Sequence, residues 1–184
     1  MTVRDIVVVD HPALRRKAKK IVKVIPEIRK LIEDMIETMR DAPGVGLAAP
    51  QVAVNERLIV VEYGEEPDEP AETDEPIKKK LYVVLNPEIV WNSEETVVGT
   101  EGCLSVPGWL GDVSRYEAVT VKGLNREGHK ITIKAEGWLA RIFQHEIDHL
   151  DGILYTDKLV SPDTWRRVTE GQEEAGDFRA EAIG

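Results

Sequence analysis

The chain has 184 residues, of which 42% are hydrophobic, a length and composition typical of one globular domain with a sizeable core. Its 34 acidic and 24 basic residues give a net charge of −10, which argues against nucleic-acid binding through a basic face. No apolar run reaches the length of a membrane span, and the first residues lack a signal-peptide core. We therefore expect a cytoplasmic protein that does not contact a membrane.

The first long element in the sequence is a helix that begins at Pro26, a residue suited to a first helical turn. Apolar residues recur at the spacing of one buried helical stripe: Ile28, Leu31, Ile32, Met35, Ile36 and Met39. The helix ends over 41–44 and leads into residues 44–51, where small side chains let the backbone pass close to a ligand or a strand. Gln51 at its end offers an amide that can donate to an oxyanion, but this stretch alone is better explained as a tight packing turn after a helix.

Two short strands follow, over 57–63 and 81–85, because both segments are rich in β-branched residues. Between them, residues 64–80 are acidic and interrupted by prolines, which predicts a surface loop without a catalytic role. Residues 117–123 and 129–134 alternate between apolar and polar side chains, and 125–128 form the predicted hairpin loop between them. His129 at the start of the last strand, like His11 in a turn before proline, is expected at the surface.

Cys103 is the only cysteine of the chain, which excludes an internal disulfide and indicates a reducing compartment. A single cysteine is most often a small buried apolar side chain. Here it lies in T-E-G-C-L-S-V-P-G, a glycine-flanked turn with a neighbouring carboxylate. Alone, this setting leaves the interpretation as a metal ligand no better than even.

The sequence H-E-x-x-H at 145–149 lies in a segment where apolar residues from 137 onward recur at helical spacing and Gly152 is the expected stop. On a helix, His145 and His149 share one face and can bind one metal ion, with Glu146 beside them as a proton carrier. A catalytic site of this type needs a third protein ligand and one open position. Together with the two histidines, Cys103 becomes the favoured third ligand.

Three stretches of this sequence together resemble the peptide deformylase family, in the same order and at similar spacing. They are residues 44–51, 101–105 and 144–150, which read G-V-G-L-A-A-P-Q, E-G-C-L-S and Q-H-E-I-D-H-L. The resemblance extends from about residue 10 to about residue 159. A lone H-E-x-x-H motif is weak evidence, whereas the three motifs together are specific.

The resemblance implies an enzyme that removes the N-formyl group from the N-terminal methionine of newly made polypeptides and releases formate. The expected metal ligands, Cys103, His145 and His149, leave one position open on a divalent metal, where a bound water becomes the hydroxide nucleophile near neutral pH. Glu146 is expected to serve as general base and then as general acid. Fe(II) is the metal that the resemblance favours, with zinc, nickel or cobalt as substitutes.

The remaining site residues follow from alignment with the family. The side chain of Gln51 and the backbone N–H of Leu104 are expected to stabilise the negative charge that develops on the carbonyl oxygen. Val45, Trp138, Ile142 and the carbon chain of Arg141 are expected to line a pocket for the methionine side chain. Gly46, Glu101 and Gly102 are expected along the backbone of the substrate, which can pair like an added strand.

Two other classes of protein share parts of this pattern. A zinc protease uses the same helix but usually recruits a third histidine or a glutamate, and a formyl-peptide assay beside an internal-peptide assay separates the two classes. A structural metal site needs four protein ligands, so His11 or His129 would have to be the fourth.

The predicted fold is α+β, with small antiparallel β-sheets packed around a central metal-binding H-E-x-x-H helix. Residues 1–168 are expected to form a single catalytic domain and 169–184 an acidic, mobile tail. Some relatives carry a basic C-terminal helix that docks on the ribosome, but residues 161–184 contain six acidic residues and three arginines. The expected partners are therefore N-formyl-methionyl nascent polypeptides, with transient proximity to the ribosome and no docking through the tail.

Overall fold

The computed structural model describes residues 2–64 and 78–168. The predicted tail over 169–184 and residues 65–77 of the predicted acidic loop lie outside the described residues. In chain order the elements are η1 (Pro12–Arg15), α1 (Pro26–Asp41), β1 (Gly46–Ala48), η2 (Ala49–Val52), β2 (Leu58–Tyr63), β3 (Lys80–Asn92), β4 (Thr96–Gly102), β5 (Trp109–Tyr116), β6 (Ala118–Leu124), β7 (Lys130–Glu136), α2 (Gly137–Leu150), η3 (Tyr155–Asp157), η4 (Pro162–Thr164) and β8 (Arg166–Arg167).

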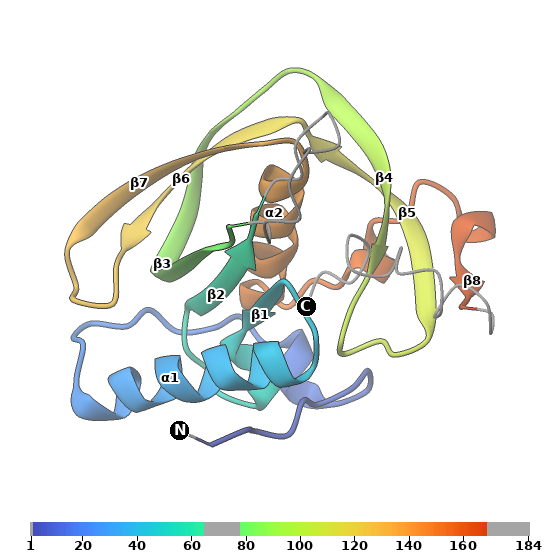
Figure 1. Cartoon of the computed structure of the whole chain (residues 1–184). Helices are drawn as coiled ribbons and strands as arrows, with labels where there is room; N and C mark the ends of the chain where they lie inside the picture. Colours follow the sequence, from blue (N-terminus) through green and yellow to red (C-terminus); the bar gives the residue numbers. More distant parts are fainter. Residues whose placement is uncertain (1, 65–77, 169–184) are drawn as a thin grey trace.

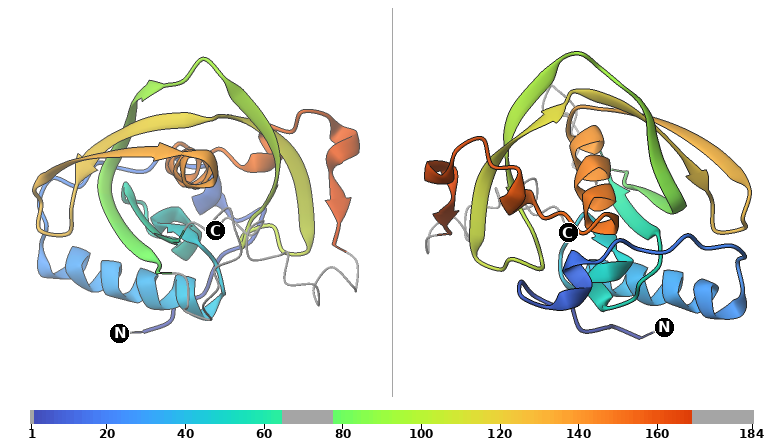
Figure 2. Two further views of the ribbon diagram at one scale, coloured as in Figure 1. Left: turned by 45° about the horizontal axis from the view of Figure 1, so that its top comes forward. Right: turned by 180° about the vertical axis from the view of Figure 1, so that it is seen from behind.

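The helix α2 lies at the centre of the molecule, between two antiparallel sheets (Figure 1). One sheet has the strand order β1-β2-β3-β6-β7 and the other the order β4-β5-β8. Viewed end-on, α2 is surrounded by the long strands that arch over it (Figure 2). The predicted α+β class and the central position of the H-E-x-x-H helix are thus both found. No described helix is long and apolar enough to cross a membrane.

The strand β2 separates the two main apolar clusters of the protein. Alternate side chains of a strand point to opposite faces. Ile59 and Val61 accordingly join the cluster that packs against α2, whereas Leu58 and Val60 join the cluster that packs against α1. Burial on both faces explains why this stretch reads as a continuous apolar run.

The predicted helix at the start of the chain agrees with α1, which begins at Pro26 and buries the whole predicted stripe. The predicted hairpin agrees with β6 and β7, which pair from Ala118 and Glu136 to Leu124 and Lys130. Strand β3 is longer than the predicted 81–85. It begins at Lys80, within the predicted loop, and continues past two register irregularities and a positive φ of 51° at Asn86.

Strands β4 and β5 were not predicted, and they carry the residues that lead into the site. Their inward side chains include Glu101 and Arg115, which are both buried, so the usual alternation of apolar and polar residues is lost. The segment expected as a turn around Cys103 is therefore the end of β4 followed by a turn. Similarly, residues 44–51 are not only a turn, because Gly46–Ala48 form β1 and pair with β2.

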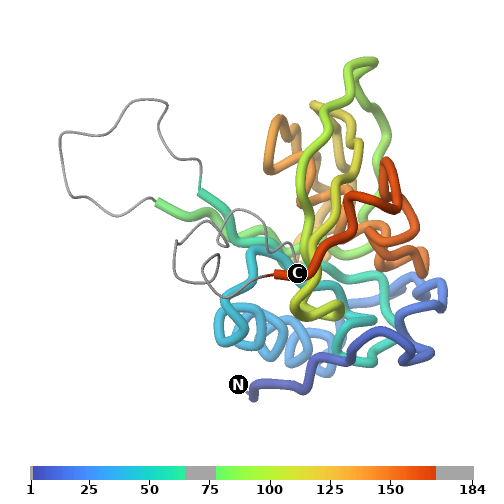
Figure 3. Tube along the Cα trace, turned by 90° about the vertical axis from the view of Figure 1, so that its right-hand side faces the viewer, coloured from blue at the N-terminus to red at the C-terminus, as the bar shows by residue number. Residues whose placement is uncertain are grey.

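The C-terminal end of the described chain lies beside β5 (Figure 3). The expected helix start at Ser161 is a single 3-10 turn, η4, in which the Ser161 hydroxyl accepts a hydrogen bond from the backbone N–H of Asp163. Trp165 then stacks on Trp109, with ring centroids 4.3 Å apart, and β8 pairs with β5. This aromatic stack attaches the segment to the body of the protein.

Candidate active site

Helix α2 and the end of β4 bring the three expected metal ligands together. His145 and His149 occupy one face of α2, and Cys103 follows directly after β4. The Sγ atom of Cys103 lies 3.3 Å from Nε2 of His149, and the ligand atoms of all three residues lie within 4.8 Å of one another. Ligands of one tetrahedral ion are expected about 3.5 Å apart, so this donor set fits a divalent metal.

The three ligands are enclosed, with exposed fractions of 6% or less. Burial raises the pKa of the Cys103 thiol, against the hydrogen bond from the backbone of Ser105 that favours the thiolate. A divalent cation at this position would favour the thiolate strongly, because a coordinating thiol is deprotonated. His11 and His129 are exposed and do not belong to the cluster, so neither supplies the fourth ligand that a closed structural site needs.

Glu101 orients one of the two histidines. Its Oε2 lies 2.9 Å from Nδ1 of His145, so Nε2 is the ring atom with which His145 would bind a metal. Arg115 donates from Nε and Nη2 to the same carboxylate, and Arg141 donates from Nη1, all at 2.8–2.9 Å. Burial opposes ionisation of Glu101, but the hydrogen bonds from Arg115 and His145 outweigh it and lower the pKa of the carboxyl. Glu101 is thus held as a carboxylate.

Glu146 is buried as completely as Glu101 but lies in the opposite surroundings. Among the described residues neither of its carboxylate oxygens has a hydrogen-bond partner. Burial and the negative charge of Glu101 raise the pKa of Glu146 well above its usual value. Gly46 of β1 makes room for it, since a Cβ atom there would lie 2.4 Å from Oε1 of Glu146. Glu146 is therefore fixed by packing and available to hold a proton.

Gln51 is fully buried beside the ligand cysteine. Its Oε1 accepts from the backbone N–H of Ala48 at 2.8 Å, which turns the amide nitrogen toward Ser105 Oγ at 3.3 Å and Cys103 Sγ at 3.7 Å. Leu104 follows Cys103 directly in the chain. Both expected oxyanion donors thus lie next to the metal ligands, and their role stays a prediction.

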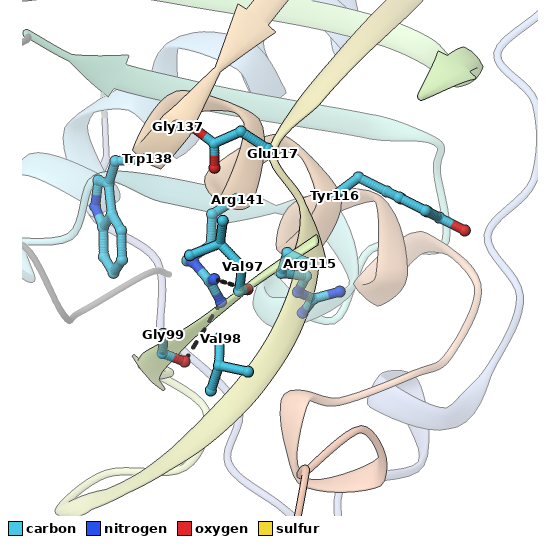
Figure 4. Close-up of a pocket in the computed structure, with 9 residues that line it drawn as sticks. All are labelled: Val97, Val98, Gly99, Arg115, Tyr116, Glu117, Gly137, Trp138 and Arg141. Carbon is cyan, nitrogen blue, oxygen red and sulfur yellow. Dashed lines mark hydrogen bonds between the residues drawn. The ribbon is translucent and has the colours of Figure 1, made fainter. Parts of the chain in front are cut away.

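The expected pocket residues are only partly brought together. Trp138 and Arg141 line a pocket of about 180 Å³ with residues of β4 and β5 (Figure 4). Val45 is partly buried and packs against the same apolar cluster as Trp138. Ile142 is enclosed in that cluster and does not line this pocket. The carbon chain of Arg141 was expected at the pocket, whereas the structure places the guanidinium there as well.

The expected peptide-binding residues lie on two strands whose outer edges are unpaired in the described part of the chain. Gly46 belongs to β1, the terminal strand of the five-stranded sheet, and Glu101 and Gly102 belong to β4, the terminal strand of the other. Unpaired edges can accept an extended peptide as an added strand. The side chain of Glu101 takes no part in this, because it is committed to the buried ion pairs.

Arg115 is the site residue that the sequence analysis missed. It donates to Glu101 and, from Nη1, to Asp148 of α2 at 2.5 Å. Its signal in the sequence is the alternation Val113, Ser114, Arg115, Tyr116, which places an arginine on the same strand face as a buried valine. A buried arginine requires an acidic partner, and Glu101 in the neighbouring motif is such a residue.

Comparisons with known proteins agree with this geometry. The family model described as polypeptide deformylase matches residues 3–165. The chain is 55% identical to a peptide deformylase of Symbiobacterium thermophilum, over 95% of this chain and 73% of the relative. It is 49% identical to one of Halothermothrix orenii, over 87% and 96%.

A crystal structure of peptide deformylase from Ehrlichia chaffeensis in complex with actinonin superposes on the fold with a TM-score of 0.79. That chain is 41% identical, and the superposition covers 89% of this chain and 92% of that one. Family model, relatives and fold therefore agree, and the chain belongs to the polypeptide deformylase family.

Proposed function

We propose that Cys103, His145 and His149 hold the metal with which this enzyme removes the N-formyl group from the N-terminal methionine of new polypeptides. The deformylase activity follows from the family, and the residue roles are our assignment. This assignment rests on one observation. The three buried ligand atoms lie within 4.8 Å of one another, beside the buried carboxylate of Glu146, which has no hydrogen-bond partner among the described residues. A divalent metal held there would activate a water for attack on the formyl carbonyl.

Glu146 moves the proton in this proposal. Its buried position raises its pKa, so the carboxylate accepts a proton readily and can pass it to the departing amine. Glu101 is held as a carboxylate and keeps His145 in one orientation. The amide of Gln51 and the backbone N–H of Leu104 donate to the carbonyl oxygen as its negative charge grows.

The metal in our proposal is Fe(II), by resemblance to the family, with zinc, nickel or cobalt as substitutes. Two imidazoles and one thiolate are compatible with each of these ions. Elemental analysis after anaerobic purification identifies the metal.

The substrate in our proposal is an extended formyl-methionyl peptide that pairs with the free edges of β1 and β4. Formyl is the smallest acyl group, and the enclosed metal ligands leave little room for a larger one. The methionine side chain enters the pocket formed by Trp138 and Arg141. Because its substrates are nascent chains, we place the enzyme in the cytoplasm, in transient proximity to the ribosome.

The test uses anaerobically purified protein and three peptides: formyl-Met-Ala-Ser, acetyl-Met-Ala-Ser and an unmodified peptide for internal cleavage. We expect formate release from the first, with about one metal ion per active chain, and no turnover of the other two. Internal cleavage would show that the site is a protease instead. Equal turnover of formyl and acetyl peptides would contradict the steric selection of the formyl group.

A further inference from the structure

The guanidinium of Arg141 is fixed on one side of the pocket. Its Nη1 donates to the carboxylate of Glu101 and the backbone oxygen of Val113, both at 2.9 Å, and lies 3.4 Å from the oxygen of Gly99. Its Nη2 donates to the backbone oxygen of Val97 at 2.7 Å. Four acceptors therefore hold this cation in one position, and only 4% of the residue is exposed.

Gly99 is what allows the guanidinium to lie against β4. A Cβ atom at this position would be 2.9 Å from both Cζ and Nη2 of Arg141, and 3.1 Å from Nε. The guanidinium thus occupies space beside the strand that a side chain at position 99 would otherwise take. Its flat group forms part of the pocket wall (Figure 4).

Two N–H groups of Arg141 have no acceptor among the described residues: the one on Nε and one of the pair on Nη2. The hydrogen bonds that Arg141 makes within the described residues use Nη1 and Nη2, and none uses Nε. Nε is also not one of the enclosed polar atoms without a partner, so this atom is accessible, and Arg141 lines the pocket. Trp138 stands beside the guanidinium, with Cζ 5.6 Å from its ring centroid, and further limits its movement.

This inference rests on the proposed function, in which the pocket takes the first side chain of the substrate. We infer that Arg141 is a specificity-determining residue whose Nε–H donates to an acceptor on that side chain, so that the enzyme also deformylates peptides that begin with formyl-methionine sulfoxide. The thioether sulfur of methionine is a weak acceptor. Its sulfoxide places a stronger acceptor on a side chain of nearly the same length. The reaction itself is unchanged, because the sulfoxide is recognised and not reduced.

A pocket without a hydrogen-bond donor would discriminate against the sulfoxide side chain. A buried polar oxygen without a donor loses its hydrogen bond to water, which lowers kcat/KM for the sulfoxide about 10²-fold relative to an apolar side chain. A pocket with a fixed N–H donor offsets that loss. The comparison between the sulfoxide and norleucine, which has the same length and no acceptor, therefore reports whether the donor is used.

The test measures kcat/KM for Ala-Ser tripeptides that begin with formyl-methionine, formyl-norleucine and formyl-methionine sulfoxide. In the unmodified enzyme we expect the sulfoxide value to lie within about tenfold of the norleucine value. In Arg141→Met we expect the sulfoxide-to-norleucine ratio to fall at least about tenfold further. Val98→Ala, on the same wall but without a donor, is the matched control and should leave the ratio unchanged.

The inference is overturned if the unmodified enzyme turns over the sulfoxide about 10²-fold more slowly than norleucine, or if Arg141→Met leaves the ratio unchanged. Each ratio compares two substrates on one protein sample, so a smaller folded fraction of the variant cancels. The measurement on the unmodified enzyme needs no variant. Absence of turnover of formyl-methionine itself would instead count against the proposed function.

Discussion

Glu101 and Glu146 are two fully buried glutamates of one site, yet their surroundings drive their ionisation in opposite directions. Glu101 receives hydrogen bonds from Arg141, Arg115 and His145, and those from Arg115 and His145 lower the pKa of its carboxyl despite burial. Glu146 has no such partner among the described residues, and burial raises its pKa. Burial alone therefore does not set the role of a carboxylate, because its hydrogen-bond donors decide whether it can take up a proton.

The two regions lie on different sides of α2. Glu101 belongs to the three-stranded sheet, where Arg115 of β5 and Arg141 of α2 converge on it. Glu146 faces β1 of the five-stranded sheet, where Gly46 contributes no side chain. One side of the helix therefore fixes a negative charge, and the other leaves a carboxyl group that can change its protonation state.

Replacement of Gln51 by leucine tests whether the reaction needs an oxyanion donor in addition to the proton carrier Glu146. Leucine is similar in size but donates no hydrogen bond. We expect kcat to fall by about 10²–10³, the usual cost of one oxyanion donor, with a much smaller change in KM. Steady-state formate release measures both constants. A change confined to KM would make Gln51 a binding residue.

Gly46→Ala breaks the packing that holds Glu146 in place. The added Cβ would lie 2.4 Å from Oε1 of Glu146, so the carboxylate must move. A shift of about 1 Å near the reacting atoms can lower kcat roughly 10²-fold, and we expect a loss of this size with the metal content unchanged.

Gly44→Ala is the matched control, since its Cβ would come closest to the flexible end of the Leu104 side chain, at 2.9 Å, and would lie at an ordinary 3.4 Å from the backbone oxygen of Gly46. Shortening the carboxylate in the double variant Gly46→Ala/Glu146→Asp should restore part of the activity lost in Gly46→Ala. An equal loss in Gly44→Ala, or no recovery in the double variant, would argue against steric positioning by Gly46.

Glu101→Gln removes the fixed negative charge on the side of α2 that faces the three-stranded sheet. The amide can still accept from His145, but buried Arg141 loses its carboxylate partner and buried Arg115 keeps only Asp148. We expect metal affinity to fall about 10–100-fold, as is usual when the partner of a metal-binding histidine is changed. Competition with a chelator measures this affinity on folded protein. Wild-type affinity would show that Glu101 does not orient His145.

Asp34 of α1 is a third buried carboxylate, and it has hydrogen-bond partners but does not belong to the candidate metal site. Burial opposes its ionisation, but hydrogen bonds from Lys30, Arg4 and the backbone of Thr2 outweigh burial and lower the pKa of its carboxyl. Its contribution to stability is therefore present above the unfolded pKa of about 3.9 and is lost as pH falls through the lower folded value.

We expect Asp34→Asn to lower the free energy of unfolding by about 1–2 kcal/mol at pH 7, with no change in bound metal. The difference from the unmodified protein should shrink as pH falls below 4. Urea unfolding at several pH values measures this difference. A constant difference across that range would mean that the charge of Asp34 contributes nothing to stability.

Elements with an apolar buried face could be predicted from the sequence, whereas elements with charged residues on their buried face could not. The helix α1 and the hairpin β6–β7 have one buried face each, so apolar periodicity reveals them. The two histidines of the candidate metal site are predicted by their helical spacing, and Cys103 by its residue type and motif. The strands β4 and β5 escaped prediction because Glu101 and Arg115 occupy their buried face. A charge on a buried face is explained only by its partner, and that partner is distant in the sequence.

The pocket was the least predictable part for a related reason. Alignment placed Arg141 at the pocket, but the guanidinium position depends on the missing side chain of Gly99 and on carbonyl groups of neighbouring strands. None of these contacts is encoded in the spacing of residues along α2. Ile142 was expected beside it, but its place on the helix turns it into the apolar cluster.

The proton-carrier role of Glu146 is tested most directly on one sample of Glu146→Gln, purified anaerobically and measured for bound metal and for formate release from a formyl-methionyl peptide. Glutamine keeps the shape of the side chain but cannot carry a proton. We predict the same metal content as the unmodified enzyme and a kcat lower by about 10²–10⁴. Turnover near the unmodified rate in the metal-loaded variant would contradict the role assigned to Glu146.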